Sequence, residues 1–152
     1  MDYTIITGKP LQVIGAELKT QLNGPDAQQI PAFLQKNFAA GTLQKIPNKV
    51  NTHANISGYT DYDAAGNYTY IMGSFVTSLA AVPEGMKARN VPAQKYAMFT
   101  VKGSGKHIIE FWRNLWSKQW TFERAFTFDY ELYDERYTGD DNSVVDIYIS
   151  IK

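Results

Sequence analysis

The same succession of secondary-structure elements is predicted twice along this chain of 152 residues. Each copy holds a kinked strand, a helix and a two-stranded hairpin, in that order. Because a three-stranded sheet with one helix buries little apolar surface alone, the two copies should merge their sheets and carry both helices on one side. The sequence therefore predicts one α+β domain over residues 1–152. It consists of pseudo-symmetric β-α-β-β modules at about 1–80 and 91–152, forming a mainly antiparallel sheet with a central groove at the seam.

The expected strands are segments rich in β-branched and aromatic residues. They cover residues 3–18 with a kink near Pro10, 54–62, 68–78, 94–102, 125–135 and 144–151. The polar stretch 63–67 contains Gly66 and is typical of a hairpin loop. Residues 82–92 contain two prolines, a glycine and alternating charges, and we expect them to form a connecting loop.

Two helices are predicted from apolar residues three and four positions apart. The first should run for about four turns, from a cap at Asp26 to a stop at Gly41. The second should run from about Lys106 to Lys118. If it continues further, one ridge holds Ile108, Trp112, Trp116 and Trp120. This stripe is wide enough to pack on the sheet and still present indole rings to a cavity, but a purely structural role in the core is equally compatible with it.

Composition and motifs argue against several classes of function. Fifteen basic residues balance fifteen acidic ones, so no overall field favours direct nucleic-acid binding. The chain has no cysteine for disulfides or thiolate catalysis. Without a leader or an apolar run of about 18 residues, we expect a cytoplasmic protein with no membrane partner. No metal-ligand cluster, phosphate loop or nucleophile elbow is present, so the sequence predicts no metal, no cofactor and no catalytic residue.

Aromatic residues make up 14% of the chain, which is consistent with a cavity lined by rings and equally with rings that only fill the core and strand faces. Along the strand at 125–135, alternation places two sets of side chains on opposite faces. One face holds Phe126, Phe128, Tyr130 and Leu132, and the other holds Asp129, Glu131 and Tyr133. If the second face lines the groove, Glu131 is a carboxylate among rings. Such a site suits an organic cation, because a desolvated ring face attracts positive charge by up to about 2 kcal/mol. If that face meets solvent instead, its carboxylates are merely solvated, and a bulge could exchange the two faces.

Several short segments in order resemble the GyrI-like small-molecule-binding domain, also called the bacterial transcription activator effector-binding domain. They are Lys9-Pro10-Leu11-Gln12-Val13-Ile14-Gly15, Ile56-Ser57-Gly58-Tyr59, Tyr68-Thr69-Tyr70-Ile71-Met72-Gly73, residues 91–99, the helix with Trp112 and Trp116, Tyr130-Glu131-Leu132-Tyr133-Asp134 and residues 145–149. The resemblance covers nearly the whole chain. It implies a pseudo-twofold fold whose central pocket binds lipophilic cations through a glutamate on the penultimate strand. Glu131 matches that glutamate, and the resemblance carries over Tyr59, Tyr96, Trp112 and Trp116 as wall residues.

Three hypotheses about function follow. The first is a stand-alone binding or sequestering module for small amphipathic, cationic ligands, with Tyr133 added to the ligand-binding residues. Family members with a DNA-binding domain regulate transcription, but because the first strand is predicted to begin at residue 3, we expect no direct promoter recognition here. The second is a hydrolase of small strained-ring compounds, as in another branch of the family, with Glu131 and Tyr133 or Tyr59 as acid and base. The third is a ligand-dependent protein-interaction module whose partner is a regulator or gyrase.

Overall fold

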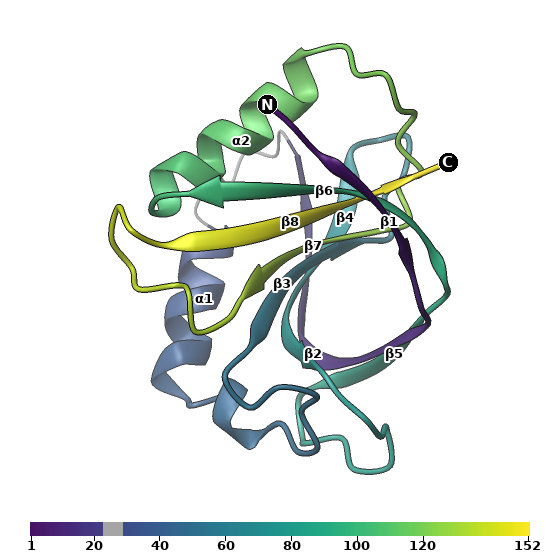
Figure 1. Cartoon of the computed structure of the whole chain (residues 1–152). Coiled ribbons are helices and arrows are strands. Elements are labelled where there is room, and N and C mark those ends of the chain that lie inside the picture. Colours follow the sequence, from purple (N-terminus) through teal and green to yellow (C-terminus); the bar gives the residue numbers. More distant parts are fainter. Residues whose placement is uncertain (23–28) are drawn as a thin grey trace.

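The computed structural model describes residues 1–22 and 29–152, and its strands form one antiparallel sheet. The strands are β1 Thr4–Gly8, β2 Leu11–Gln21, β3 Asn55–Thr60, β4 Asn67–Phe75, β5 Lys87–Val91, β6 Gln94–Lys102, β7 Phe128–Tyr133 and β8 Val144–Ile151. The helices are α1 Gln29–Ala39, α2 Gly105–Ser117 and the 3-10 turn η1 Leu43–Lys45 (Figure 1). The predicted α+β class, a mainly antiparallel sheet with two helices, is confirmed.

The order of strands in the sheet is β1-β6-β8-β7-β3-β4-β2-β5. Strands from the first half of the chain, β2 to β4, therefore lie together, and so do β6 to β8 from the second half. The two sets meet at the pairing of β7 with β3, which lies at the centre of the sheet. The seam between the two halves is consequently formed by these two strands.

The kink near Pro10 separates two strands that belong to different parts of the sheet. β1 pairs with β6, whereas β2 pairs with β4 and β5. Gly8 pairs with Gln94 and Leu11 pairs with Val91. The bend between β1 and β2 therefore lies beside the bend between β5 and β6. The predicted loop at 82–92 was therefore wrong in part, because its last residues form β5. This segment carries charges at an edge of the sheet, and pairing with β2 is what makes it a strand.

The second helix matches its prediction within one residue at each end, and α1 lies within the range predicted for the first helix. α1 has 11 residues, or about three turns. Gly41 follows it with φ +66° and thereby ends the helical path, while the predicted cap at Asp26 lies outside the described residues. At the start of α2, the side chain of His107 accepts a hydrogen bond from the backbone N–H of Ser104 at 3.2 Å. No helix in residues 1–22 and 29–152 has the length and hydropathy needed to cross a membrane.

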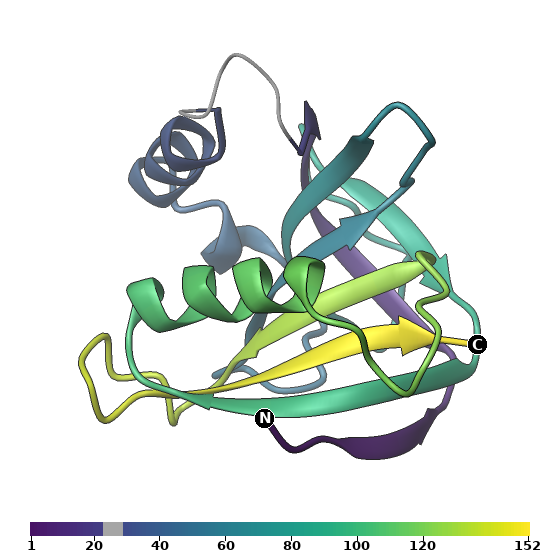
Figure 2. The same cartoon turned by 90° about the horizontal axis from the view of Figure 1, so that it is seen from above.

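Both helices pack on the same face of the sheet, as Figure 2 shows. Phe33 of α1 contacts Tyr70 of β4, and Trp112 of α2 contacts Tyr59 of β3. These two tyrosines also contact each other, with ring centroids 5.4 Å apart. The opposite face of the sheet holds a separate apolar cluster, whose buried members are Val13, Ile56, Ile71, Val91, Tyr96, Phe128 and Tyr130. Aromatic residues therefore pack between the helices and the central strands.

Candidate functional site

Glu131 lies on β7 at the centre of the sheet, with its side chain on the helix-covered face. It is only 3% exposed. The predicted alternation holds within the strand, because Phe128 and Tyr130 belong to the cluster on the opposite face. Phe126 does not follow it. This residue precedes β7, has φ +55° and packs on Trp116 of α2, so its ring lies on the helix side.

Three neutral donors surround the Glu131 carboxylate. The hydroxyl of Tyr59 and the indole N–H of Trp112 donate to Oε2, at 2.8 and 2.6 Å. The hydroxyl of Tyr133 donates to Oε1. Glu131 takes part in no ion pair within the described residues, and residues 23–28 contain no lysine or arginine. The carboxylate is therefore hydrogen-bonded without a counter-charge.

Burial controls protonation in this cluster. Removal from water raises the pKa of Glu131 above its ordinary 4.5, and hydrogen bonds from Tyr133, Tyr59 and Trp112 oppose that rise. Burial, together with the charge of Glu131, raises the pKa of Tyr59 and of Tyr133 well above the ordinary range. Both phenols consequently stay protonated and act as donors. No group of three potential metal-ligating side chains occurs in the part of the chain that the structure describes.

The wall beside Glu131 is built from rings on three elements. The ring of Trp112 lies 4.8 Å from that of Tyr59, measured between centroids. Tyr59 in turn lies 6.0 Å from Tyr68 and 5.4 Å from Tyr70, whose hydroxyl is 2.7 Å from the Oγ of Ser57. Sequence reasoning missed Tyr68 and Tyr70 as site residues. Their positions two apart on the predicted strand at 68–78 were the signal that could have found them.

The six residues predicted to bind the ligand do not all lie together in the structure. Four of them, Glu131, Tyr59, Trp112 and Tyr133, form one hydrogen-bonded cluster. Tyr96 does not join it, because its ring packs on Tyr130 and Tyr148 at the opposite face of the sheet. Trp116 lies one helical turn beyond Trp112 and packs on Arg124, which pairs with a different carboxylate. Trp120 does not continue the ridge, since α2 ends at Ser117, and its indole N–H donates to the backbone oxygen of Leu115.

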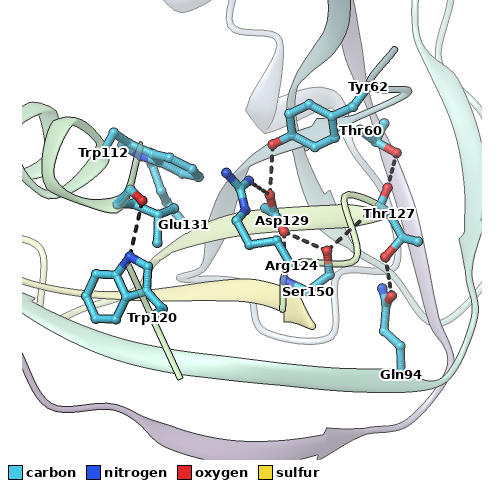
Figure 3. A network of polar contacts seen from close by, with 11 residues as sticks. Thr60, Tyr62, Gln94, Trp112, Trp120, Arg124, Thr127, Asp129, Glu131 and Ser150 are labelled. Atoms are coloured by element: carbon cyan, nitrogen blue, oxygen red, sulfur yellow. Dashed lines mark hydrogen bonds and ion pairs between the residues drawn. The ribbon is translucent and has the colours of Figure 1, made fainter. Parts of the chain in front are cut away.

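The second carboxylate is Asp129, which is fully buried and well partnered (Figure 3). It accepts hydrogen bonds from Arg124 Nη2 at 2.7 Å, from the Tyr62 hydroxyl at 2.8 Å and from both the N–H and the hydroxyl of Ser150. The Arg124 guanidinium lies 4.4 Å from the ring of Trp116. Sequence reasoning missed this ion pair, because Arg124 belongs to an irregular segment with no periodic pattern.

The comparisons with known proteins agree with this architecture. A model of the family described as integron-associated effector-binding protein matches residues 4–151. The transcriptional regulator BrlR of Pseudomonas aeruginosa is 42% identical over 91 residues, which cover 57% of this chain and 34% of the regulator. This chain therefore matches about a third of BrlR. The putative transcriptional regulator YobU of Bacillus subtilis is 32% identical over 84% of this chain and 82% of YobU.

A solved structure of SAV2435, bound to tetraphenylphosphonium, has the same fold. It superposes with a TM-score of 0.82 and 19% identity, covering 100% of this chain and 94% of SAV2435. At this identity the likeness shows the fold alone. The match to the family model over nearly the whole length and the sequence identity with YobU show, in addition, which family the chain belongs to. This chain belongs to the integron-associated effector-binding protein family and is an effector-binding domain of the GyrI-like type.

Proposed function

We propose that this protein binds small, lipophilic organic cations at Glu131. The observation that carries the proposal is a carboxylate 3% exposed that has neutral donors but no counter-cation. Taking an ionised carboxylate out of water costs several kcal/mol, which hydrogen bonds offset only in part. An organic cation supplies the missing charge and brings apolar surface with it.

The rings around Glu131 suit the same ligand. The rings of Tyr59 and Trp112 contact each other at an interplanar angle of 52° beside the carboxylate, and both residues are partly exposed. A cation over such faces gains up to about 2 kcal/mol when it is desolvated. The acceptor at Glu131 and the rings together favour a cation that is aromatic or otherwise lipophilic over a small hydrated one.

The relatives support this ligand class. SAV2435, which shares the fold, was solved with tetraphenylphosphonium, a lipophilic aromatic cation. BrlR and YobU are described as transcriptional regulators, the second as a putative one. We extend the regulatory role to this chain as a proposal. It would sequester its ligand or report ligand occupancy to a protein partner.

A fluorescence titration tests the binding site. 1-Methylquinolinium is a rigid aromatic cation, and 1-methylnaphthalene is its neutral isostere. We expect saturable quenching of tryptophan fluorescence by the cation, because Trp112 lies beside Glu131. Glu131→Gln should weaken cation binding at least tenfold, or about 1.4 kcal/mol. Glu135→Gln is the matched control, since it removes one charge from an exposed residue near the same strand. Equal cation affinity in wild type and Glu131→Gln contradicts the proposal.

Hydrolysis is the second candidate function. Tyr59 and Tyr133 both donate to a glutamate whose pKa is raised, an arrangement that suits a general base with acidic neighbours. A panel of small epoxides and esters tests it. Turnover that is lost in both Glu131→Gln and Tyr133→Phe would establish catalysis, and no turnover of any compound in the panel would exclude these substrate classes.

A further inference from the structure

Arg124 has hydrogen-bonding capacity that the fold leaves unused. Its side chain is only 9% exposed, and Nη2 pairs with Asp129 at 2.7 Å. Nε and Nη1 are buried, yet neither has a hydrogen-bond partner among the described residues. A buried N–H without an acceptor costs about 1–3 kcal/mol, and more when the group is charged. An acceptor that arrives with a ligand would remove this cost.

Two exposed aromatic rings lie against the guanidinium of Arg124. Trp116 and Phe126 lie 4.4 and 4.2 Å from Arg124, and they are 45% and 42% exposed. Phe126 has φ +55°, a backbone conformation that is unusual for a bulky residue and costs of order 1–3 kcal/mol. Residues held in this way are typical of ligand clamps. The rings that shield Arg124 are therefore at the surface, where a planar ligand can replace or stack on them.

Arg124 and Glu131 lie at neighbouring places between β7 and α2, because the residues that contact them are similarly spaced on these two elements. On β7, Asp129 and Glu131 are two residues apart on one face, or about 6.6 Å. On α2, Trp112 and Trp116 are four residues apart, or about 6 Å along the axis. Trp112 contacts Glu131, and Trp116 contacts the arginine that pairs with Asp129. One ligand of moderate size can therefore reach both centres.

The charges decide which acceptor fits. Asp129 already neutralises Arg124, so a ligand carboxylate would place a second negative charge in the same buried region. We propose that Arg124, Trp116 and Phe126 form a subsite for a neutral oxygen acceptor, such as an aromatic ketone or amide carbonyl. The acceptor belongs to the ligand whose cationic centre binds Glu131, a role that rests on the proposed function.

A matched pair of ligands tests the subsite. The first is a 2-naphthyl ketone that carries a trimethylammonium group two methylenes from the carbonyl, and the second has CH2 in place of that carbonyl. Calorimetric titration of the wild-type protein should give at least tenfold tighter binding of the ketone. Because apolar burial favours the methylene compound, a preference for the ketone requires a donor in the site.

Two variants locate the donor. The double variant Arg124→Met with Asp129→Asn removes the ion pair without leaving an unpaired charge, and it should reduce the preference to within twofold. Glu131→Gln should weaken both ligands and keep the preference. Equal or tighter binding of the methylene compound by wild type, a comparison that needs no variant, overturns the subsite and leaves the proposed function intact. If neither ligand binds, both proposals fail.

Discussion

Two carboxylates on β7 share a face and a lack of exposure, but they differ in their partners. Asp129 pairs with Arg124 and accepts hydrogen bonds from Tyr62 and Ser150. Among residues 1–22 and 29–152, the donors to Glu131 are two tyrosines and a tryptophan, all of them neutral. The first charge is balanced inside the fold, whereas the second is not. A buried charge that the fold leaves unbalanced is therefore the better candidate for a ligand site.

The sharpest way to break this comparison is to remove the charge of Asp129. Asp129→Asn should lower the free energy of unfolding by about 3–5 kcal/mol, because it leaves Arg124 buried without a counter-charge. Urea denaturation followed by circular dichroism measures the change. The double variant with Arg124→Met should recover most of the loss. A loss below about 1 kcal/mol for Asp129→Asn alone would show that the ion pair is not a structural requirement.

The affinity for a permanently charged cation should depend on pH through Glu131. A cation binds the ionised carboxylate, and burial raises the pKa of that group above 4.5. Affinity for 1-methylquinolinium should therefore rise with pH, by up to about tenfold per unit below the pKa of Glu131, and then level off. Titrations between pH 4.5 and 8 measure this. The same slope in Glu131→Gln would assign the effect to another group.

Removing the charge of Glu131 should not destabilise the protein at neutral pH, in contrast to removing the charge of Asp129. Since the folded state raises the pKa of Glu131, its contribution to stability is fully present below pH 4.5 and is lost as pH rises through the folded pKa. At pH 8, Glu131→Gln should be at least as stable as wild type. The difference between the two proteins, measured by urea denaturation, should shift in favour of wild type toward pH 4.5. Strong destabilisation of Glu131→Gln at pH 8 would contradict the idea of an unbalanced charge.

The smallest expected effect separates the two tryptophans of α2. Trp112→Phe removes the indole N–H that donates to Glu131 and should weaken 1-methylquinolinium binding by about 0.5–1 kcal/mol. Trp116→Phe should leave this affinity unchanged, because Trp116 lies beside Arg124 and the ligand has no carbonyl. Calorimetry on both variants makes the comparison. Equal losses would mean that the two centres act as one.

Local patterns predicted much of this fold. The apolar spacing of residues 106–118 located α2 within one residue, and the strand at 94–102 matches β6. Predictions failed where a distant partner decides the outcome. Residues 87–91, predicted as part of a loop, become a strand through pairing with β2. Tyr96 was predicted beside Glu131, but the pairing of β6 with β8 places its ring on the other face.

The sequence by itself determined that Asp129 and Glu131 share a face, because alternation along a strand is a local property of the backbone. It also identified Glu131 through its resemblance to a family. Only the tertiary structure decided which carboxylate received the arginine. Arg124 reaches Asp129 through an irregular segment with a left-handed residue at Phe126, and no periodic pattern specifies such a path. The balance of buried charge, which distinguishes the two centres, was therefore set by packing between distant parts of the chain.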